Sequence, residues 1–227
     1  MDLFSSLFAN ANCRRPSELL CNGSHSERGN SEDMKRSRSI LSWAAGVLGL
    51  IVIVAVVGIL WLRRENLADV GPVTGTLVVT SADFADGGKI PEKFACDAGI
   101  SPALAWSQLP TGTRSIALIV EDPDAPFGFI HWVVYGLPGD TRELPDGASS
   151  QPLPGNARVG KNGYGGTGYV GPCPPFGSHH YIFRVYAVDK NIEVPAGASK
   201  QELIAAITGH VLAKGKLVGI YGRKQEK

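Results

Sequence analysis

An uninterrupted apolar run near the start of the chain divides it into two parts. Residues 40–62 are 23 consecutive residues without a charged side chain. At about 1.5 Å of rise per residue, a helix of this length crosses the roughly 30 Å hydrocarbon core of a bilayer. Trp43 and Trp61 lie near its two ends, where indole rings favour the membrane interface. The pattern therefore predicts a transmembrane helix and not a buried core helix.

The charges beside this run predict its orientation. Four basic residues precede it, at positions 28, 35, 36 and 38, whereas Arg63 and Arg64 follow it and the next basic residue is Lys89. The positive-inside rule places the N-terminus inside and the C-terminal domain outside. A secretory signal peptide has an apolar region of about 7–15 residues and a small-residue cleavage site, so this longer run is interpreted as an uncleaved signal anchor. The predicted location is the cell membrane, single-pass, with an extracytoplasmic domain.

These patterns predict four segments along the chain. They are a disordered N-terminal tail at 1–39, the transmembrane signal anchor at 40–62, a short linker at 63–74 and a folded domain at 75–223. The tail is predicted to be disordered because it is rich in Ser, Asn, Arg and Gly and has no sustained apolar periodicity. Met34, which directly precedes the basic stretch, is an alternative start of translation.

In the folded domain, short apolar runs alternate with turns that are rich in Gly and Pro. Runs of β-branched and aromatic residues predict strands at 75–80, 115–121, 131–137, 181–188 and 216–222. Ser199 and Glu202 have the spacing of a capping box, apolar residues continue at helical spacing to Leu212, and Gly215 is the predicted helix stop. The predicted fold class is all-β-rich, a β-sandwich with a small number of peripheral helices, preceded by the transmembrane helix.

The charge balance of the domain excludes one class of function. Residues 66–227 carry 14 Lys and Arg against 15 Asp and Glu. A nucleic-acid-binding domain would show a basic excess, so no nucleic-acid partner is expected. Cys13 and Cys21 have no His or Cys partner at zinc-ligand spacing, so no metal site is expected, and no cofactor is expected either.

Two proline-rich segments hold the densest clusters of polar residues. The first is Glu121-Asp122-Pro123-Asp124-Ala125-Pro126 with His131-Trp132 after it, and the second is Gly171-Pro172-Cys173-Pro174-Pro175-Phe176-Gly177-Ser178-His179-His180-Tyr181. Each segment leads into a predicted strand. Rigid proline-rich turns fix polar groups at strand ends, and binding sites concentrate there. Taken alone, the aspartates fit turn caps equally well, and His131 fits an ordinary core histidine.

The two segments resemble the signature regions of the phosphatidylethanolamine-binding protein family, which includes Raf kinase inhibitor protein. The likeness is closest to the bacterial and archaeal branch, because the stretch Cys96-Asp97-Ala98-Gly99-Ile100-Ser101-Pro102 with Trp106 is also similar to that branch. The resemblance covers about residues 75–223 and leaves out the apolar run.

The resemblance implies a β-sandwich with a small pocket for an anion, such as a phosphate-like group or a phospholipid head group. The pocket residues that it implies are Asp122, His131, Pro174, Pro175, His179 and Tyr181, with Asp124 and Pro126 shaping the first loop. Family members also inhibit kinases or peptidases by direct contact, so a protein partner is a further expectation. The chain is thus expected to be a membrane-anchored, non-catalytic binding protein.

The chemistry of these residues agrees with an anion pocket. Protonated His131 or His179 would supply charge and N–H donors, and Tyr181 would supply a hydroxyl donor. Asp122 repels an anion, so its expected role is to orient a histidine or to contact the amine of an ethanolamine head group. Because an ordinary histidine has a pKa near about 6.5, binding is expected to strengthen as the pH falls toward 6. His180 stands where the family usually has a cation, and strand alternation turns it away from the pocket.

A hydrolase is the alternative function. It would use Asp122 and His131 as an acid–base pair in the cell envelope. Ser178 is next to His179, but neighbouring strand residues face opposite ways, and the chain has no Gly-x-Ser-x-Gly elbow. The sequence therefore favours binding over catalysis.

Cys96 and Cys173 are the two cysteines of the predicted domain. In an oxidising compartment an even number of cysteines favours a disulfide, which would close a loop of about 77 residues. Two buried thiols are the alternative, and the sequence leaves both open.

Overall fold

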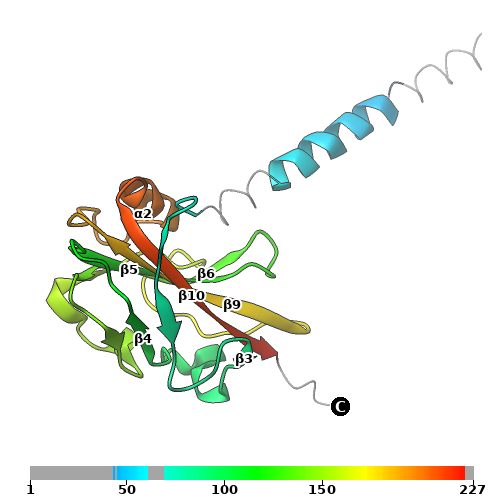
Figure 1. Cartoon of the computed structure of the whole chain (residues 1–227). Helices are drawn as coiled ribbons and strands as arrows, with labels where there is room; N and C mark the ends of the chain where they lie inside the picture. The colour runs from blue at the N-terminus through cyan, green and yellow to red at the C-terminus, as the bar shows by residue number, and fades with distance from the viewer. Residues whose placement is uncertain (1–42, 44, 61–68, 223–227) are drawn as a thin grey trace, which may run out of the picture. The chain divides into compact units, whose positions relative to one another are not determined.

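The computed structural model describes residues 43, 45–60 and 69–222 (Figure 1). The predicted tail at 1–39 lies outside the described residues, as do residues 61–68 of the predicted anchor and linker. Residues 69 and 70 of that linker join the folded domain. Asp69 accepts a hydrogen bond from the Tyr186 hydroxyl at 2.8 Å, and Val70 packs against the buried cluster beside it.

The predicted transmembrane helix is wrong. Residues 45–60 form a helix, and within the described part of the chain no helix is both long and apolar enough to span a bilayer. The signal anchor at 40–62 and the single-pass, extracytoplasmic location at the cell membrane are corrected by this finding.

A large mixed sheet forms the centre of the folded domain (Figure 1). Its strands, in spatial order, are β1 (Gly75–Thr76), β10 (Val211–Gly222), β9 (Ser178–Val188), β5 (Ser115–Asp122), β6 (Phe129–Pro138) and β8 (Arg158–Val159), and β3 (Gly88–Lys89) also pairs with β10. β1 and β3 run parallel to β10, whereas the other pairs are antiparallel. The predicted all-β sandwich is therefore wrong, since the large sheet is mixed, with parallel as well as antiparallel pairs. The sequence could not show this, because hydrophobic alternation predicts strands but not the direction in which they pair.

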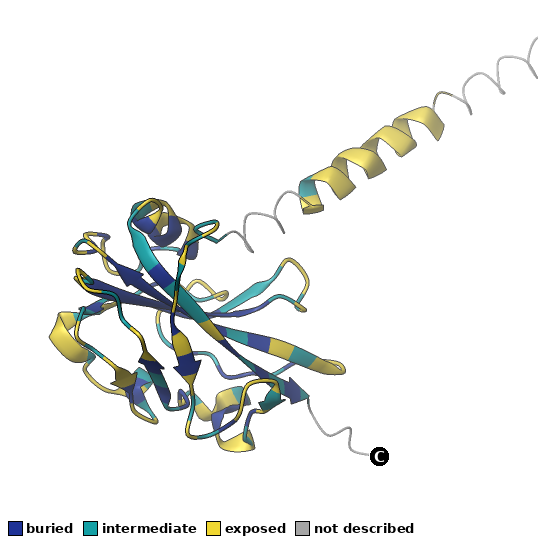
Figure 2. Cartoon of the chain, viewed as in Figure 1, coloured by how far each residue is buried: buried dark blue, intermediate teal, exposed yellow. Residues whose placement is uncertain are grey.

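Each face of this sheet is covered by a different layer. A smaller antiparallel sheet of β2 (Val78–Thr80), β4 (Leu104–Ser107) and β7 (Glu143–Leu144) shares a core with one face. The helix α2 (Lys200–Ile207) packs its buried side chains on the other face. Figure 2 shows the buried positions concentrated along the long strands and on the inner side of α2. Short 3-10 turns complete the fold at Glu92–Phe94, Cys96–Ala98, Ala148–Ser150 and Pro154–Asn156.

The predicted helix begins where its capping box indicates but ends early. The Ser199 hydroxyl accepts from the Glu202 amide, and the Glu202 side chain accepts from the Ser199 amide. The helix ends at Ile207, and Gly209 follows with a φ of 82°, a left-handed value that glycine adopts at low cost. Residues 211 and 212, predicted to be helical, belong to β10. His210, predicted on the helix, lies in the turn and hydrogen-bonds Asp189 at 2.9 Å.

A buried charge network ties α2 to the sheet. The Lys200 ammonium at the start of α2 lies 2.5 Å from one carboxylate oxygen of Glu121 on β5. The Arg184 guanidinium on β9 lies 2.6 Å from the other oxygen. Lys200 and Glu121 are only 2% and 1% exposed. When ion pairs are buried to this degree, removing one partner leaves the other as an uncompensated charge and destabilises the fold.

Candidate functional site

Three strand ends meet at one edge of the large sheet. β5 ends at Asp122, whereas its antiparallel neighbours β6 and β9 begin at Phe129 and Ser178. Because neighbouring antiparallel strands place the end of one beside the start of the next, both proline-rich segments come to the same edge. The β5–β6 turn is closed by a hydrogen bond from the Gly128 amide to the Ala125 carbonyl at 2.9 Å.

A cavity of about 410 Å³ lies at this edge. Seven of the eight predicted site residues line it, namely Asp122, Pro126, His131, Pro174, Pro175, His179 and Tyr181. Asp124 does not line the cavity. Its carboxylate accepts hydrogen bonds from the backbone amide and the ring of His180, at 2.8 and 2.7 Å, and so holds the start of β9. His180 is exposed and points away from the cavity lining, as strand alternation requires.

His131 reaches the cavity because of an irregularity in the sheet. Val120 pairs with Trp132 and Glu121 pairs with Ile130, so His131 is the extra residue between these two pairs. An extra residue of this kind re-aims a side chain relative to strict strand alternation. The ring of His131 consequently packs against the ring of Tyr181, with centroids 5.1 Å apart.

Asp122 is held by three hydrogen bonds. One of its oxygens accepts from the backbone amides of Asp124 and Ala125 at 2.8 and 3.0 Å, and the other lies 2.7 Å from Nδ1 of His179. Since a carboxylate only accepts, Nδ1 of His179 is the donor. This arrangement fixes the His179 ring and leaves Nε2 as the ring nitrogen for a ligand.

The His131 ring differs from that of His179 in its hydrogen-bond partner. Its Nδ1 lies 2.6 Å from the carbonyl oxygen of Val170, which can only accept, so Nδ1 carries the proton. Burial lowers the pKa of His131, while the Val170 carbonyl and Asp122 oppose that change. The ring is therefore neutral at pH 7, and its Nε2 is a hydrogen-bond acceptor. The expectation that His131 supplies positive charge does not agree with this environment.

The Tyr181 hydroxyl is a buried donor that faces this polar cluster. The residue is 1% exposed, and its oxygen has no hydrogen-bond partner among the described protein groups. Burial, together with the nearby carboxylates of Asp122 and Asp124, raises the pKa of Tyr181, so the hydroxyl keeps its proton. A buried hydroxyl without a partner costs about 1–3 kcal/mol, which an acceptor in the cavity would offset.

A disulfide joins Cys96 to Cys173, and both cysteines line the cavity. It connects the 3-10 turn at Cys96–Ala98 to the segment that carries Pro174 and Pro175. The Cys96 amide also donates to the Pro172 carbonyl at 2.9 Å. One wall of the cavity is thus fixed by a covalent bond between segments that are 77 residues apart.

Further side chains line the cavity beside the predicted site residues. Phe129 packs on His131 and on Tyr164, with ring centroids 4.8 and 4.9 Å apart, so these rings form an aromatic wall. Gly163 makes this possible, because a Cβ there would lie 2.4 Å from the Phe129 ring. Asp97 adds a second carboxylate to the lining. The dense glycines of residues 160–168 were the available signal, since glycine often marks a close approach.

Comparison with known proteins identifies relatives of the folded domain. The model of the family described as phosphatidylethanolamine-binding protein matches residues 80–222. A protein of Methanothermobacter thermautotrophicus, called UPF0098 protein, is 43% identical over 143 residues, which cover 62% of this chain and 95% of that protein. A UPF0098 protein of Aquifex aeolicus is 41% identical over 150 residues, covering 64% and 88%.

Solved structures show the same likeness. A phosphatidylethanolamine-binding protein homologue of Chlamydia trachomatis is 37% identical with a TM-score of 0.61, and the match covers 66% of this chain and 100% of that one. An Escherichia coli structure, described as a new member of the mammalian family, is 31% identical with a TM-score of 0.62 and the same coverage. This chain belongs to that family, the phosphatidylethanolamine-binding proteins, whose name describes ligand binding and not catalysis.

Proposed function

We propose that the cavity binds the head group of a phospholipid or a similar zwitterion, with its phosphate on Tyr181 and His179. The observation that carries this proposal is the Tyr181 hydroxyl in the cavity wall, a buried donor that has no hydrogen-bond partner among the described residues. The Nε2 atom of His179 becomes a second, charged donor when the ring is protonated. Together they suit an oxygen-rich anion.

The remaining lining groups favour a zwitterion over a simple anion. Asp97 and Asp122 contribute two carboxylates to the cavity, and Nε2 of neutral His131 is an acceptor. These groups repel a bare phosphate but suit an ammonium group. The aromatic wall of Phe129 and Tyr164 adds faces that attract cations. A phosphate linked to an amine satisfies both halves of the cavity.

The contacts do not support the alternative hydrolase. Asp122 directs its oxygens to His179 and to two backbone amides, and His131 directs Nδ1 to Val170. The two residues are therefore each committed to other partners and not to one another as an acid–base pair. Ser178 pairs with Gly222 across the sheet and is outside the cavity lining.

Tyr181→Phe is expected to weaken binding of glycerophosphoethanolamine about tenfold, because it removes one buried hydrogen bond to the phosphate and keeps the ring. Isothermal titration calorimetry on the full chain measures this change. Glycerol phosphate and ethanolamine, each carrying one half of the zwitterion, are expected to bind more weakly than the whole molecule.

Tyr169→Phe is the matched control, since Tyr169 is a buried tyrosine outside the cavity lining. It should leave the affinity unchanged. The unliganded Tyr181→Phe protein should be at least as stable as the wild type, because within the described part of the chain the hydroxyl has no hydrogen-bond partner to lose. Equal affinity of the wild type and Tyr181→Phe would refute the assignment.

A further inference from the structure

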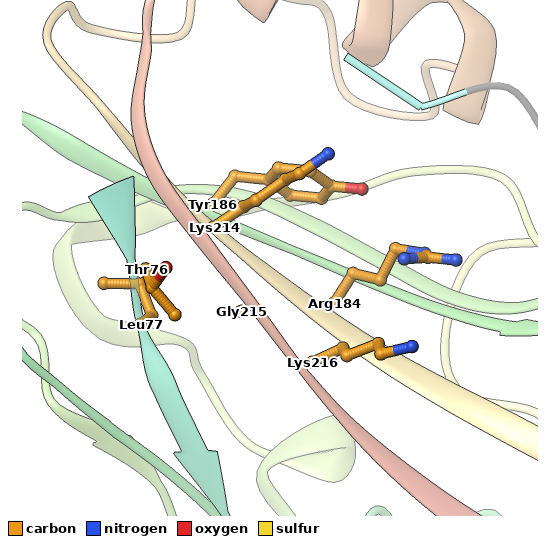
Figure 3. A pocket seen from close by; sticks show the side chains of 7 residues that line it. All are labelled: Thr76, Leu77, Arg184, Tyr186, Lys214, Gly215 and Lys216. Carbon is orange, nitrogen blue, oxygen red and sulfur yellow. The ribbon is translucent and has the colours of Figure 1, made fainter. Parts of the chain in front are cut away.

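A second hollow, of about 370 Å³, lies over β9 and β10 (Figure 3). Thr76, Leu77, Arg184, Tyr186, Lys214, Gly215 and Lys216 line it. None of these residues lines the cavity that holds His131 and His179. Three of the seven are cations and none is a carboxylate, so the chemistry of the two sites is different.

The register of the two strands brings the cations together. Arg184 lies opposite Lys216, and Tyr186 lies opposite Lys214. Because side chains two residues apart share a face, all four project from the same side of the sheet. Figure 3 shows the charged ends of Arg184, Lys214 and Lys216 on this side of the strands.

One of these pairings is unfavourable without an anion. Arg184 and Lys216 are like charges directly opposite each other on neighbouring strands, which destabilises a sheet. Arg184 is partly compensated, because its Nε donates to Glu121 at 2.6 Å. Lys216 is exposed, and no ion pair involves it among residues 69–222.

The carboxylates around the hollow leave a net positive charge. Lys214 donates to Asp69 at 2.8 Å and to the Gly71 carbonyl at 2.6 Å. Glu121 serves both Arg184 and Lys200. In this described network, four cations (Arg184, Lys200, Lys214, Lys216) therefore face two carboxylates (Asp69, Glu121), an excess of two positive charges.

We propose that this hollow binds a doubly charged oxyanion, either inorganic phosphate or a phosphate monoester. The planar guanidinium of Arg184 presents its η nitrogens for paired hydrogen bonds, and Lys216 adds a point charge. Two negative charges match the excess and relieve the opposition between Arg184 and Lys216. Thr76 and Leu77 form the other wall, where a small organic substituent of a monoester has room.

Titration of the full chain with inorganic phosphate, followed by NMR of the backbone amides, tests the proposal. Saturable shifts are expected at Gly215 and Lys216. They are separate from shifts at His179 and Tyr181, which report on the head-group cavity, so the two proposals can fail independently. If a phosphate monoester saturates these amides at lower concentration than inorganic phosphate does, the organic wall contributes.

Lys216→Gln should weaken the phosphate affinity read at Gly215 about tenfold, whereas Lys216→Arg should retain it within about twofold. Lys89→Gln is the matched control, because Lys89 is an exposed strand lysine outside the hollow, and it should change nothing. In phosphate-free buffer Lys216→Gln should be as stable as the wild type or more so, since it removes a repulsion. No saturable shift at Gly215 and Lys216, or equal affinities for Lys216→Gln and Lys89→Gln, would overturn the proposal.

Discussion

Replacing Glu121 with leucine is expected to lower the free energy of unfolding by about 3–5 kcal/mol, because it leaves the buried Lys200 ammonium without its carboxylate. Glu121 lies between two cations, 2.5 Å from Lys200 and 2.6 Å from Arg184. Removing one member of a buried network costs far more than the net contribution of the whole network. Urea unfolding of the full chain at neutral pH measures the change.

Two further variants separate charge burial from simple loss of packing. Glu121→Leu combined with Lys200→Met should recover much of the lost stability, since the double variant no longer buries the lysine charge. Glu143→Gln, at an exposed glutamate on β7, should stay within about 0.5 kcal/mol of the wild type. A loss below about 1 kcal/mol for the single Glu121 variant would contradict the role assigned to this network.

Removing the disulfide is expected to have an effect of similar size. The double substitution Cys96→Ser and Cys173→Ser should lower the free energy of unfolding by about 2–5 kcal/mol, since the bond closes 77 residues of the chain. Because both cysteines line the proposed head-group cavity, the same variant should also bind glycerophosphoethanolamine more weakly. Urea unfolding and calorimetric titration measure the two effects.

Reduction of the wild-type protein is the matched comparison. Once mass spectrometry shows that the thiols of Cys96 and Cys173 are free, the reduced protein should unfold at the same urea midpoint as the double variant. The double variant itself should not respond to reductant. A wild type whose unfolding midpoint is the same before and after complete reduction would show that the bond does not stabilise the fold.

Much of the strand content could be predicted because the long strands carry the runs of β-branched and aromatic residues that favour them. The predicted strand at 115–121 corresponds to β5 and the one at 181–188 to β9. The helix was overextended because Val211 and Leu212 fit both a helical face and the start of β10. Only the backbone shows that Gly209, with its positive φ, separates the two elements.

The candidate site, too, could be predicted from the sequence only in part. The two proline-rich segments could be selected from the sequence because each combines rigid turns with titratable groups. The charge and hydrogen-bonding role of His131 could not be predicted, because they depend on the Val170 carbonyl, 39 residues away, and on burial. The cationic hollow was also beyond prediction. Arg184 and Lys216 lie on separate strands, and only the register of β9 against β10 places them opposite each other.

The two histidines of the cavity differ in their capacity to carry positive charge. Burial lowers the pKa of His131, so in the proposed binding mode His179 is the histidine that donates to a ligand phosphate. A protonated His179 ring would donate to the phosphate from Nε2 with a positive charge, so in this binding mode a lower pH should favour binding. Glycerophosphoethanolamine suits the test, since its phosphodiester keeps one charge between pH 6 and 8.

The most direct measurement is the affinity of the full chain for glycerophosphoethanolamine at pH 6, 7 and 8, at constant ionic strength. The wild type should bind more tightly at pH 6 than at pH 8. His179→Asn should bind weakly at every pH, whereas His180→Asn, at the exposed neighbour outside the cavity, should keep the wild-type profile. A wild-type affinity that does not change with pH, or a pH dependence that survives in His179→Asn, would contradict the proposed capture of a phosphate by His179 and Tyr181.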